Sequence, residues 1–235
     1  MQVAVGSHCL DCIKAARPDV KTRARFWNAR QPTLVTYSLI AINAVVYLWT
    51  LSSTKNEGEL ALFKPSLEFN GEYYRLLTSG FLHFSIFHIG MNMLLLFQLG
   101  QLLEPAIGRV RFSLVYFAAL LAGSLGALIV NPLVPSGGAS GAVFGLMTAA
   151  AVGLHRRGVN VFQTGIGTTL ILNLVLTFTI RNISIGAHLG GAIAGAICGF
   201  VILAPRHAVM PKWASYATPI AVVLIAVAGS LAIAA

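Results

Sequence analysis

Long runs of apolar residues alternate with short polar connections along most of the chain. Runs of about the length that crosses a bilayer, roughly 20 residues, predict helices near 33–53, 84–103, 110–130, 140–154, 162–180, 186–204 and 217–235. The expected fold class is an all-α polytopic membrane protein. The fourth run is short and opens with polar or small residues, which indicates a helix that begins below the membrane surface in a protein-lined cavity.

The composition agrees with this pattern. Of the 235 residues, 57% are hydrophobic and 10% are charged, against roughly 45–50% and about 25% in ordinary soluble domains. Such a chain is not a water-soluble globular protein, and seven spans leave little sequence for a separate domain. Residues 1–30 lack the apolar core and cleavage site of a secretory signal, so this tail is expected to be retained.

The distribution of basic residues predicts the topology. The formal net charge is +9, but no basic, aromatic-interleaved RNA motif is present, so nucleic acid is not an expected partner. One set of alternate connections holds six basic residues in 1–30 and Arg109, Arg111, Arg156, Arg157, Arg206 and Lys212, and the other holds Lys55, Lys64, Arg75 and Arg181. The positive-inside rule therefore predicts a multi-pass protein of the cell membrane with a cytoplasmic amino terminus, an outer carboxyl terminus and an external loop at 54–83.

Polar residues capable of chemistry gather at one depth. His83, His88 and Asn92 lie at the start of the second predicted helix, Ser140 at the start of the fourth, and His188 near the start of the sixth. All three helices are predicted to run from outside to inside, so these residues share a depth near the outer face. Because buried ionisable residues are costly in a membrane, they are candidates for function.

The stretch Ser136-Gly137-Gly138-Ala139-Ser140-Gly141 favours a nucleophile. Gly138 and Gly141 permit positive φ angles and close backbone approach, and a helix start offers unpaired N–H groups to an oxyanion. The alternative is that Ser140 is only a helix N-cap. A serine nucleophile needs a base, and His188, followed by glycines that allow close helix packing, lies at the same depth.

The acidic residues favour a Ser-His dyad over a triad. Four of them lie in the external loop and two in the tail, and Glu104 lies at the far end of the second helix, so no carboxylate falls within a span near His188. The alternative of a metal site stays open, because His83, His88 and His188 could supply three ligands.

Together these motifs resemble the rhomboid family of intramembrane serine proteases over residues 33–204. The elements are His83-x-x-x-x-His88-x-x-x-Asn92, Glu104, Gly138-Ala139-Ser140-Gly141 and Gly186-Ala187-His188-x-x-Gly191-x-x-x-Gly195. The resemblance implies a six-helix rhomboid core, here with a seventh C-terminal transmembrane helix, as in some members.

The resemblance also implies roles for the residues and needs no metal or cofactor. Ser140 would be the nucleophile and His188 the general base, with His88, Asn92 and the Ser140 backbone N–H stabilising the oxyanion. His83 would brace the neighbouring loop, and Glu104 would pack near the cytoplasm.

Two positions depart from the family pattern. Tyr74-Arg75 stands where many members have Trp-Arg, and Phe144 stands where a tyrosine often stacks on the catalytic histidine. Phe144 keeps the ring face but lacks the hydroxyl.

Three parts of the chain are expected. Residues 1–32 form a basic cytoplasmic tail, 33–204 the core, and 205–235 a linker and the extra helix. In the tail, Cys9 and Cys12 form a single C-x-x-C, which resembles half of a zinc module found before some rhomboid cores; two ordinary thiols are the alternative.

The implied activity is hydrolysis of peptide bonds in transmembrane segments of other membrane proteins, within the lipid bilayer and near its outer face. Two other classes remain. A catalytically inert rhomboid-like binder would lose Ser140 or His188, and both are present. A transporter would favour ionisable groups near the bilayer midplane, whereas the charged residues here lie at helix ends.

Overall fold

The computed structural model describes residues 32–180, 183–205 and 210–235. The compact unit discussed below is Thr33–Ala235. The predictions for the tail, including its Cys9 and Cys12, fall outside the described residues.

Long helices form where the apolar runs predict them. They are α3 (Leu34–Thr50), α7 (Ile86–Ile107), α8 (Arg109–Val130), α9 (Ser140–His155), α10 (Ile166–Thr179), α11 (Ile185–Ile202) and α12 (Ala214–Ala234). By length and composition, α7, α8, α11 and α12 are candidate membrane spans, and α3, α9 and α10 are shorter apolar helices. The all-helical prediction is confirmed for the described residues, which contain one isolated β-bridge and no strand.

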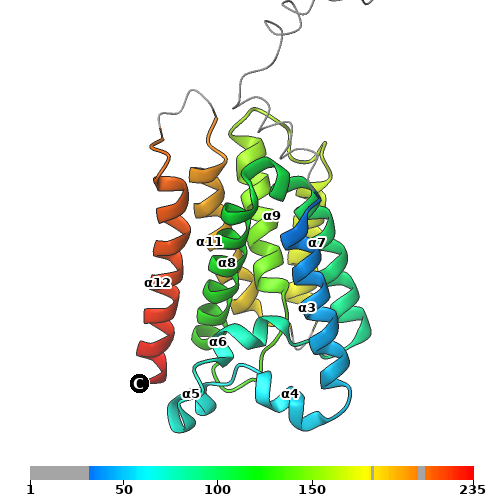
Figure 1. Cartoon of the computed structure of the whole chain (residues 1–235), viewed down its shortest axis with the longest axis vertical. Coiled ribbons are helices and arrows are strands. Elements are labelled where there is room, and N and C mark those ends of the chain that lie inside the picture. The colour runs from blue at the N-terminus through cyan, green and yellow to red at the C-terminus, as the bar shows by residue number, and fades with distance from the viewer. Residues whose placement is uncertain (1–31, 181–182, 206–209) are drawn as a thin grey trace, which may run out of the picture. The chain divides into compact units, whose positions relative to one another are not determined.

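The predicted 54–83 loop is itself folded into short helices at one end of the bundle, where α12 also ends (Figure 1). These are α4 (Thr54–Leu60), α5 (Lys64–Asn70), α6 (Arg75–Thr78) and the 3₁₀ turn η1 (Ser79–Phe81). The buried Arg75 organises them, because its guanidinium donates to Glu72 at 2.7 Å, to the Ala61 carbonyl at 2.8 Å and to the Gly58 carbonyl.

Helix α11 packs backbone against backbone on two neighbours. A Cβ at Gly191 would overlap the Gly141 carbonyl of α9, and one at Gly195 would overlap the backbone of Gly145. On the other side of α11, a Cβ at Gly190 would overlap the Ala122 carbonyl of α8. The spaced glycines therefore allow α8, α9 and α11 to approach more closely than side chains would permit.

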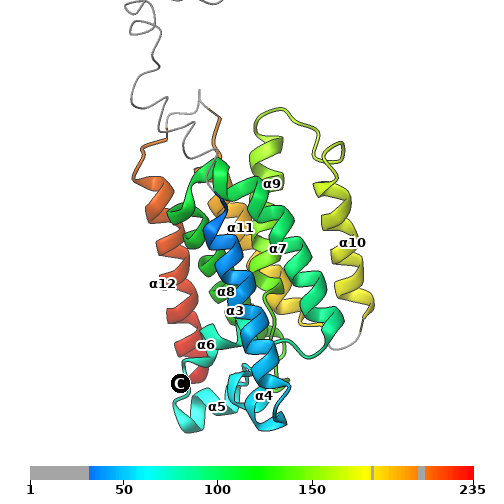
Figure 2. The ribbon, with the colours of Figure 1, turned by 45° about the vertical axis from the view of Figure 1, so that its right-hand side comes forward.

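Helices α10 and α12 lie at the periphery. Helix α12 packs on α8 and α11 and is tied to α8 by Arg111, whose Nε donates to Ser215 Oγ at 2.9 Å. Helix α10 stands apart at the edge of the bundle (Figure 2), and of its 14 residues only Gly167 and Thr177 are buried.

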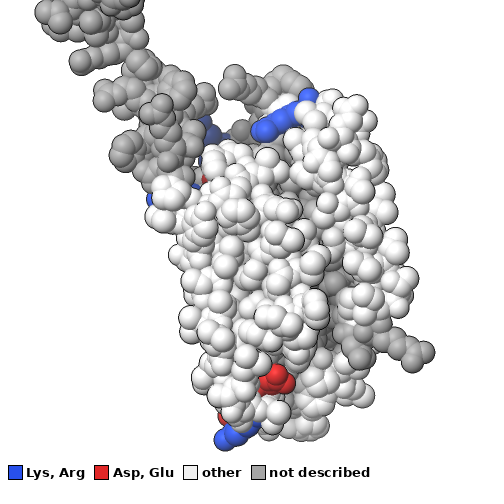
Figure 3. Space-filling model, turned by 90° about the vertical axis from the view of Figure 1, so that its right-hand side faces the viewer, with Lys and Arg blue, Asp and Glu red and all other residues white. Residues whose placement is uncertain are grey.

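Among the described residues, the surface between the two ends shows no Lys, Arg, Asp or Glu on the face drawn in Figure 3. Lys, Arg, Asp and Glu side chains are confined to the upper and lower ends of this view. Such an uncharged band fits the hydrocarbon layer of a bilayer.

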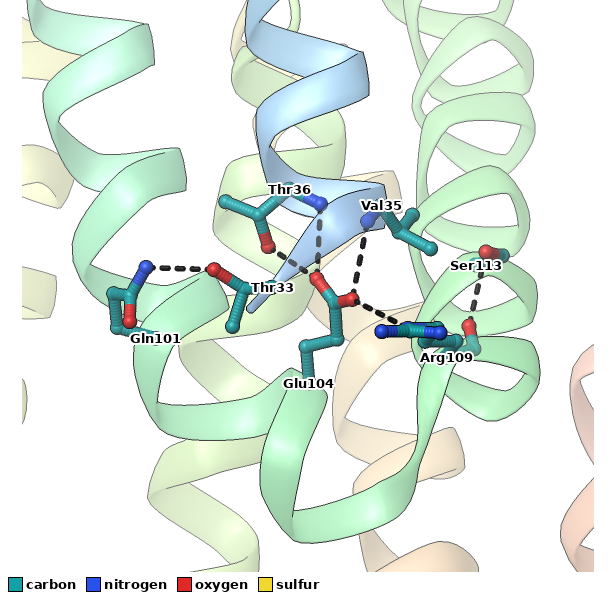
Figure 4. Close-up of polar contacts among 7 residues, drawn as sticks. All are labelled: Thr33, Val35, Thr36, Gln101, Glu104, Arg109 and Ser113. Atoms are coloured by element: carbon teal, nitrogen blue, oxygen red, sulfur yellow. Dashed lines mark hydrogen bonds and ion pairs between the residues drawn. The ribbon is translucent and has the colours of Figure 1, made fainter. Parts of the chain in front are cut away.

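Glu104, expected to have a packing role near the cytoplasm, is buried and also caps the start of α3 (Figure 4). Its carboxylate, 3% exposed, accepts from the Val35 N–H at 3.0 Å, the Thr36 N–H at 2.9 Å and the Thr36 hydroxyl at 2.7 Å. Arg109 Nε lies 3.8 Å from it. The carboxylate thus satisfies N–H groups that have no partner within their own helix and opposes the positive end of the helix dipole.

Glu104→Gln is expected to destabilise the bundle by about 1–3 kcal/mol. The amide lacks the negative charge, and its NH₂ group would face the backbone N–H groups that the carboxylate accepts from. Thermal unfolding in detergent measures this. The control is Glu68→Gln, whose carboxylate only pairs with Lys64 at 3.6 Å on the surface and should change the stability by less than about 0.5 kcal/mol. Equal effects of the two substitutions would contradict the capping role.

Candidate active site

Ser140 and His188 are in direct contact. Ser140 is the first residue of α9, His188 lies in the first turn of α11, and Ser140 Oγ is 2.7 Å from His188 Nε2. His188 is 7% exposed. The two residues are 48 positions apart and meet because α9 and α11 start at the same end of the bundle and pack through Gly141 and Gly191.

Ser140 is not an N-cap. The N-cap residue of α9 is Ala139, and no side chain in the described part of the chain makes a capping hydrogen bond to this helix. The alternative interpretation of Ser140 is therefore wrong for this structure, and its hydroxyl is directed to the imidazole.

The segment before Ser140 is held by the 54–83 loop. Leu62 and Ser136 exchange backbone hydrogen bonds of 2.8 and 2.9 Å, and the Gly138 N–H donates to the Ser79 carbonyl at 2.8 Å. Gly138 has φ +132°, a backbone conformation that side chains disfavour. These bonds fix the turn that presents Ser140.

His88 lies against the same turn. A Cβ at Gly138 would come within 2.7 Å of His88 Nε2 and 3.6 Å of Ser140 Oγ, so a glycine is needed for both side chains to face one small volume. Asn92, 5% exposed, lies one turn further along α7 and its Nδ2 donates to the His88 carbonyl at 2.9 Å.

Phe144 stacks on His188. The ring centroids are 4.3 Å apart and the planes differ by 23°. The ring face that the sequence predicts at this position is present, and Phe144 lies one helical turn after Ser140 on α9. The stacking leaves the imidazole edge, with its two nitrogens, free to hydrogen-bond.

His83 is fully buried beside His88 rather than beside His188. Its ring meets that of His88 edge to face at 4.9 Å, and its Nδ1–H donates to the Phe81 carbonyl at 3.3 Å. Burial, and next the neighbouring His88, lower the pKa of His83 to about 4, so its ring is neutral near pH 7. Among the residues that the structure describes, Nε2 of His83 has no hydrogen-bond partner.

Metal-binding geometry is not found in the part of the chain that the structure describes, where no three His, Cys, Asp or Glu side chains group around one point. His83 and His88 adjoin each other, while His188 is engaged by Ser140.

One contact of His188 escaped the sequence analysis. Thr177 of α10 is 2% exposed, and its Oγ1 lies 2.7 Å from His188 Nδ1. Thr177 lies at the end of a helix, whereas the candidate residues were sought at the starts of helices. The predicted topology contains a signal for it, because α10 runs in the opposite direction and its last turn therefore lies at the depth of Ser140. Within the described residues, no carboxylate forms an ion pair with His188.

Comparison with known proteins finds a matching family model and several similar sequences. A family model described as the rhomboid domain matches residues 70–205, a range that contains Ser140 and His188 and ends before α12. The chain is 33% identical over 200 residues to "Rhomboid protease GluP" of Bacillus subtilis (strain 168), covering 82% of this chain and 39% of that protein.

Two further relatives are similar over shorter stretches. One is "Putative rhomboid protease YdcA" of Bacillus subtilis (strain 168), 33% identical over 142 residues, with 59% of this chain and 71% of that protein covered. The other is "RHOMBOID-like protein 1" of Arabidopsis thaliana, 35% identical over 140 residues, with 56% and 35% covered. The chain thus spans well under half the length of the first and third of these relatives.

Gly191→Ala is expected to destabilise the protein by about 1–3 kcal/mol, because the added methyl overlaps the Gly141 carbonyl and forces α9 and α11 apart. Gly90→Ala on α7, where a Cβ meets no atom within 4 Å, is the matched control and should be neutral or stabilising. Thermal unfolding in detergent compares them. Equal stability of the two variants would refute the close packing of α9 and α11.

Proposed function

Because the chain belongs to the rhomboid family, we propose that it is an intramembrane serine endopeptidase that cleaves transmembrane segments of other membrane proteins. Family and apolar helices together make it a multi-pass membrane protein. The observation that carries the proposal is the 2.7 Å contact between Ser140 Oγ and His188 Nε2. A nucleophile within hydrogen-bond reach of a base is the geometry that acyl transfer requires.

In the proposed reaction Ser140 is the nucleophile. His188 Nε2 accepts the hydroxyl proton as Ser140 Oγ bonds to the scissile carbonyl carbon, whose oxygen becomes an oxyanion. The imidazolium then protonates the leaving amine as the C–N bond breaks, which leaves an acyl ester on Ser140. Water attacks the ester with His188 again as base, and the acid product and the free serine are released.

The oxyanion is stabilised by donors around Ser140. The backbone N–H of Ser140 belongs to the first turn of α9, where N–H groups lack partners within the helix. His88 faces Gly138 and Ser140. Asn92 Nδ2 donates to the His88 carbonyl, and the proposed role requires this amide to leave that carbonyl and donate to the oxyanion. Donors aimed at such a charge in a dry site contribute several kcal/mol.

Phe144, Gly138, Gly141 and His83 support this arrangement. Phe144 keeps the imidazole plane fixed, Gly138 admits His88 beside Ser140, and Gly141 lets α11 approach. His83 packs edge to face on His88 and braces the connection before α7.

The substrate is a transmembrane helix of another protein in the lipid bilayer. A peptide must unwind to reach Ser140, and lipid offers no partners for its freed backbone groups. The polar starts of α7, α9 and α11 would supply such partners and admit water in the proposed reaction, so we place cleavage at this depth, near the outer face.

The proposed topology has six spans in a core of residues 33–204 and a seventh in α12. Residues 1–32 form a cytoplasmic tail and residues 205–235 a linker and packing helix, with the carboxyl terminus outside. Helices α3, α9 and α10 are shorter than the four candidate spans, and we assign them as spans as well. For α9 the short length fits a start within the protein rather than in lipid.

Labelling with a fluorophosphonate tests the reaction. Wild-type protein in detergent should be labelled and should cleave a model single-pass substrate. Ser140→Ala should show neither, and His188→Ala should lose at least about 10²-fold in both rates. Ser136→Ala, four residues earlier in the segment that precedes α9, is the matched control and should behave as wild type.

Each contrary outcome has a distinct meaning. Absence of labelling and cleavage in correctly folded wild type would identify an inert rhomboid-like binder. Cleavage that persists in Ser140→Ala and stops with a chelator would replace the serine mechanism by a metal-dependent one.

Reporter fusions test the topology. A phosphatase that is active only outside the cytoplasm should be active when fused after Ala235 and inactive when fused within 156–158. The reverse pattern, or equal activity at both points, would contradict the assigned orientation.

A further inference from the structure

We propose that Thr177 is a positioning residue for His188, fixing the imidazole tautomer that lets Nε2 accept the Ser140 proton. This proposal rests on the proposed function. It assigns to the last turn of α10 the orienting task that a carboxylate performs in a Ser-His-Asp triad.

Counting hydrogens assigns the direction of each bond. The Thr177 hydroxyl has one hydrogen and two close partners, the Asn173 carbonyl at 2.7 Å and His188 Nδ1 at 2.7 Å. A carbonyl only accepts, so the hydroxyl hydrogen is committed to Asn173 and a lone pair faces Nδ1. Nδ1 must therefore carry a hydrogen and donate it to Thr177.

The hydrogen on Nδ1 determines which role Nε2 can play. With the hydrogen on Nδ1, neutral His188 has a lone pair on Nε2, directed at the Ser140 hydroxyl 2.7 Å away. If Thr177 instead donated to Nδ1, Nε2 would carry the hydrogen and could not accept the serine proton. The bond to Asn173, the usual helical contact of a threonine with the carbonyl four residues earlier, prevents this.

A hydroxyl suits the burial of this site. Thr177 is 2% and His188 7% exposed, and a carboxylate there would bring a costly buried charge. A neutral acceptor orients the ring without that cost. When His188 becomes imidazolium, its Nδ1–H donates a charge-assisted, stronger bond to the same oxygen.

The contact also links the site to α10. Thr177 is one of only two buried residues on this peripheral helix, and the other, Gly167, lies near its opposite end. Orientation of His188 therefore depends on the docking of the last turn of α10. Displacement of that turn would free Nδ1 and leave both tautomers accessible.

Thr177→Val removes the hydroxyl and keeps the side-chain shape. We expect kcat for a model substrate to fall on the order of tenfold with little change in KM, since one hydrogen bond is lost. The rate of fluorophosphonate labelling of Ser140 should fall by a similar factor, because labelling needs no bound substrate helix. Thr177→Ser restores the hydroxyl and should recover most of both rates.

Thr179→Val is the matched control. Thr179 Oγ1 donates to the Val175 carbonyl at 2.8 Å, the same helical contact, but the residue is exposed and its hydroxyl bonds only to carbonyls of its own helix among the described residues. This variant should keep wild-type rates, and melting temperatures of all variants separate folding defects from changes in rate.

Nitrogen NMR reads the tautomer without any activity. In ¹⁵N-histidine-labelled protein at about pH 8, where an ordinary histidine is neutral, the His188 signals, assigned by their loss in His188→Ala, should show hydrogen on Nδ1. Thr177→Val should shift them toward a mixture of tautomers.

Several results would overturn the positioning role. These are hydrogen on Nε2 in the wild type, wild-type rates in Thr177→Val, or equal losses in Thr177→Val and Thr177→Ser. Failure of the proposed function is a different result, because it would be seen as an unlabelled wild type or as activity that survives Ser140→Ala.

Discussion

The close approach of α11 to α9 and α8 is the constraint on which the rest of this structure depends. In lipid, helices gain little from burying apolar surface against each other, and association relies on van der Waals contact between small residues. Gly191 and Gly195 place the backbone of α11 against Gly141 and Gly145 of α9. Because these glycine positions carry no side chain, the first turns of both helices come together, and Ser140 meets His188 at hydrogen-bond distance.

Around this contact the described residues arrange polar groups without an ion pair at Ser140 or His188. The Gly138 turn is anchored to Ser79, and His83 is kept neutral by burial. Thr177 contacts the outer nitrogen of His188. The charged groups that do matter, Arg75 and Glu104, act elsewhere: one gathers the short helices of the 54–83 loop and the other caps α3. Reactivity and stability thus rest on different side chains.

Apolar runs predicted the long helices because span length is set by the bilayer and leaves a strong signal. Comparing helix directions also placed Ser140, His188 and His88 at one depth, and the structure holds them in one neighbourhood.

The short helices α4 to α6 were not predicted, since four to seven residues carry too little periodicity and depend on Arg75. The N-cap alternative for Ser140 and the capping by Glu104 depend on side-chain direction, which spacing alone does not fix. Whether Thr177 faces His188 depends on how α10 is rotated about its axis. The apolar pattern of the sequence does not determine this rotation.

The most direct test of the account is to find where a fluorophosphonate reacts. Peptide mass spectrometry of the labelled wild-type protein should show one adduct, on Ser140, because only this serine has a histidine nitrogen within 2.7 Å among the described residues. An adduct on another serine, or none on folded protein, would contradict the claim that packing of α9 against α11 creates an activated serine.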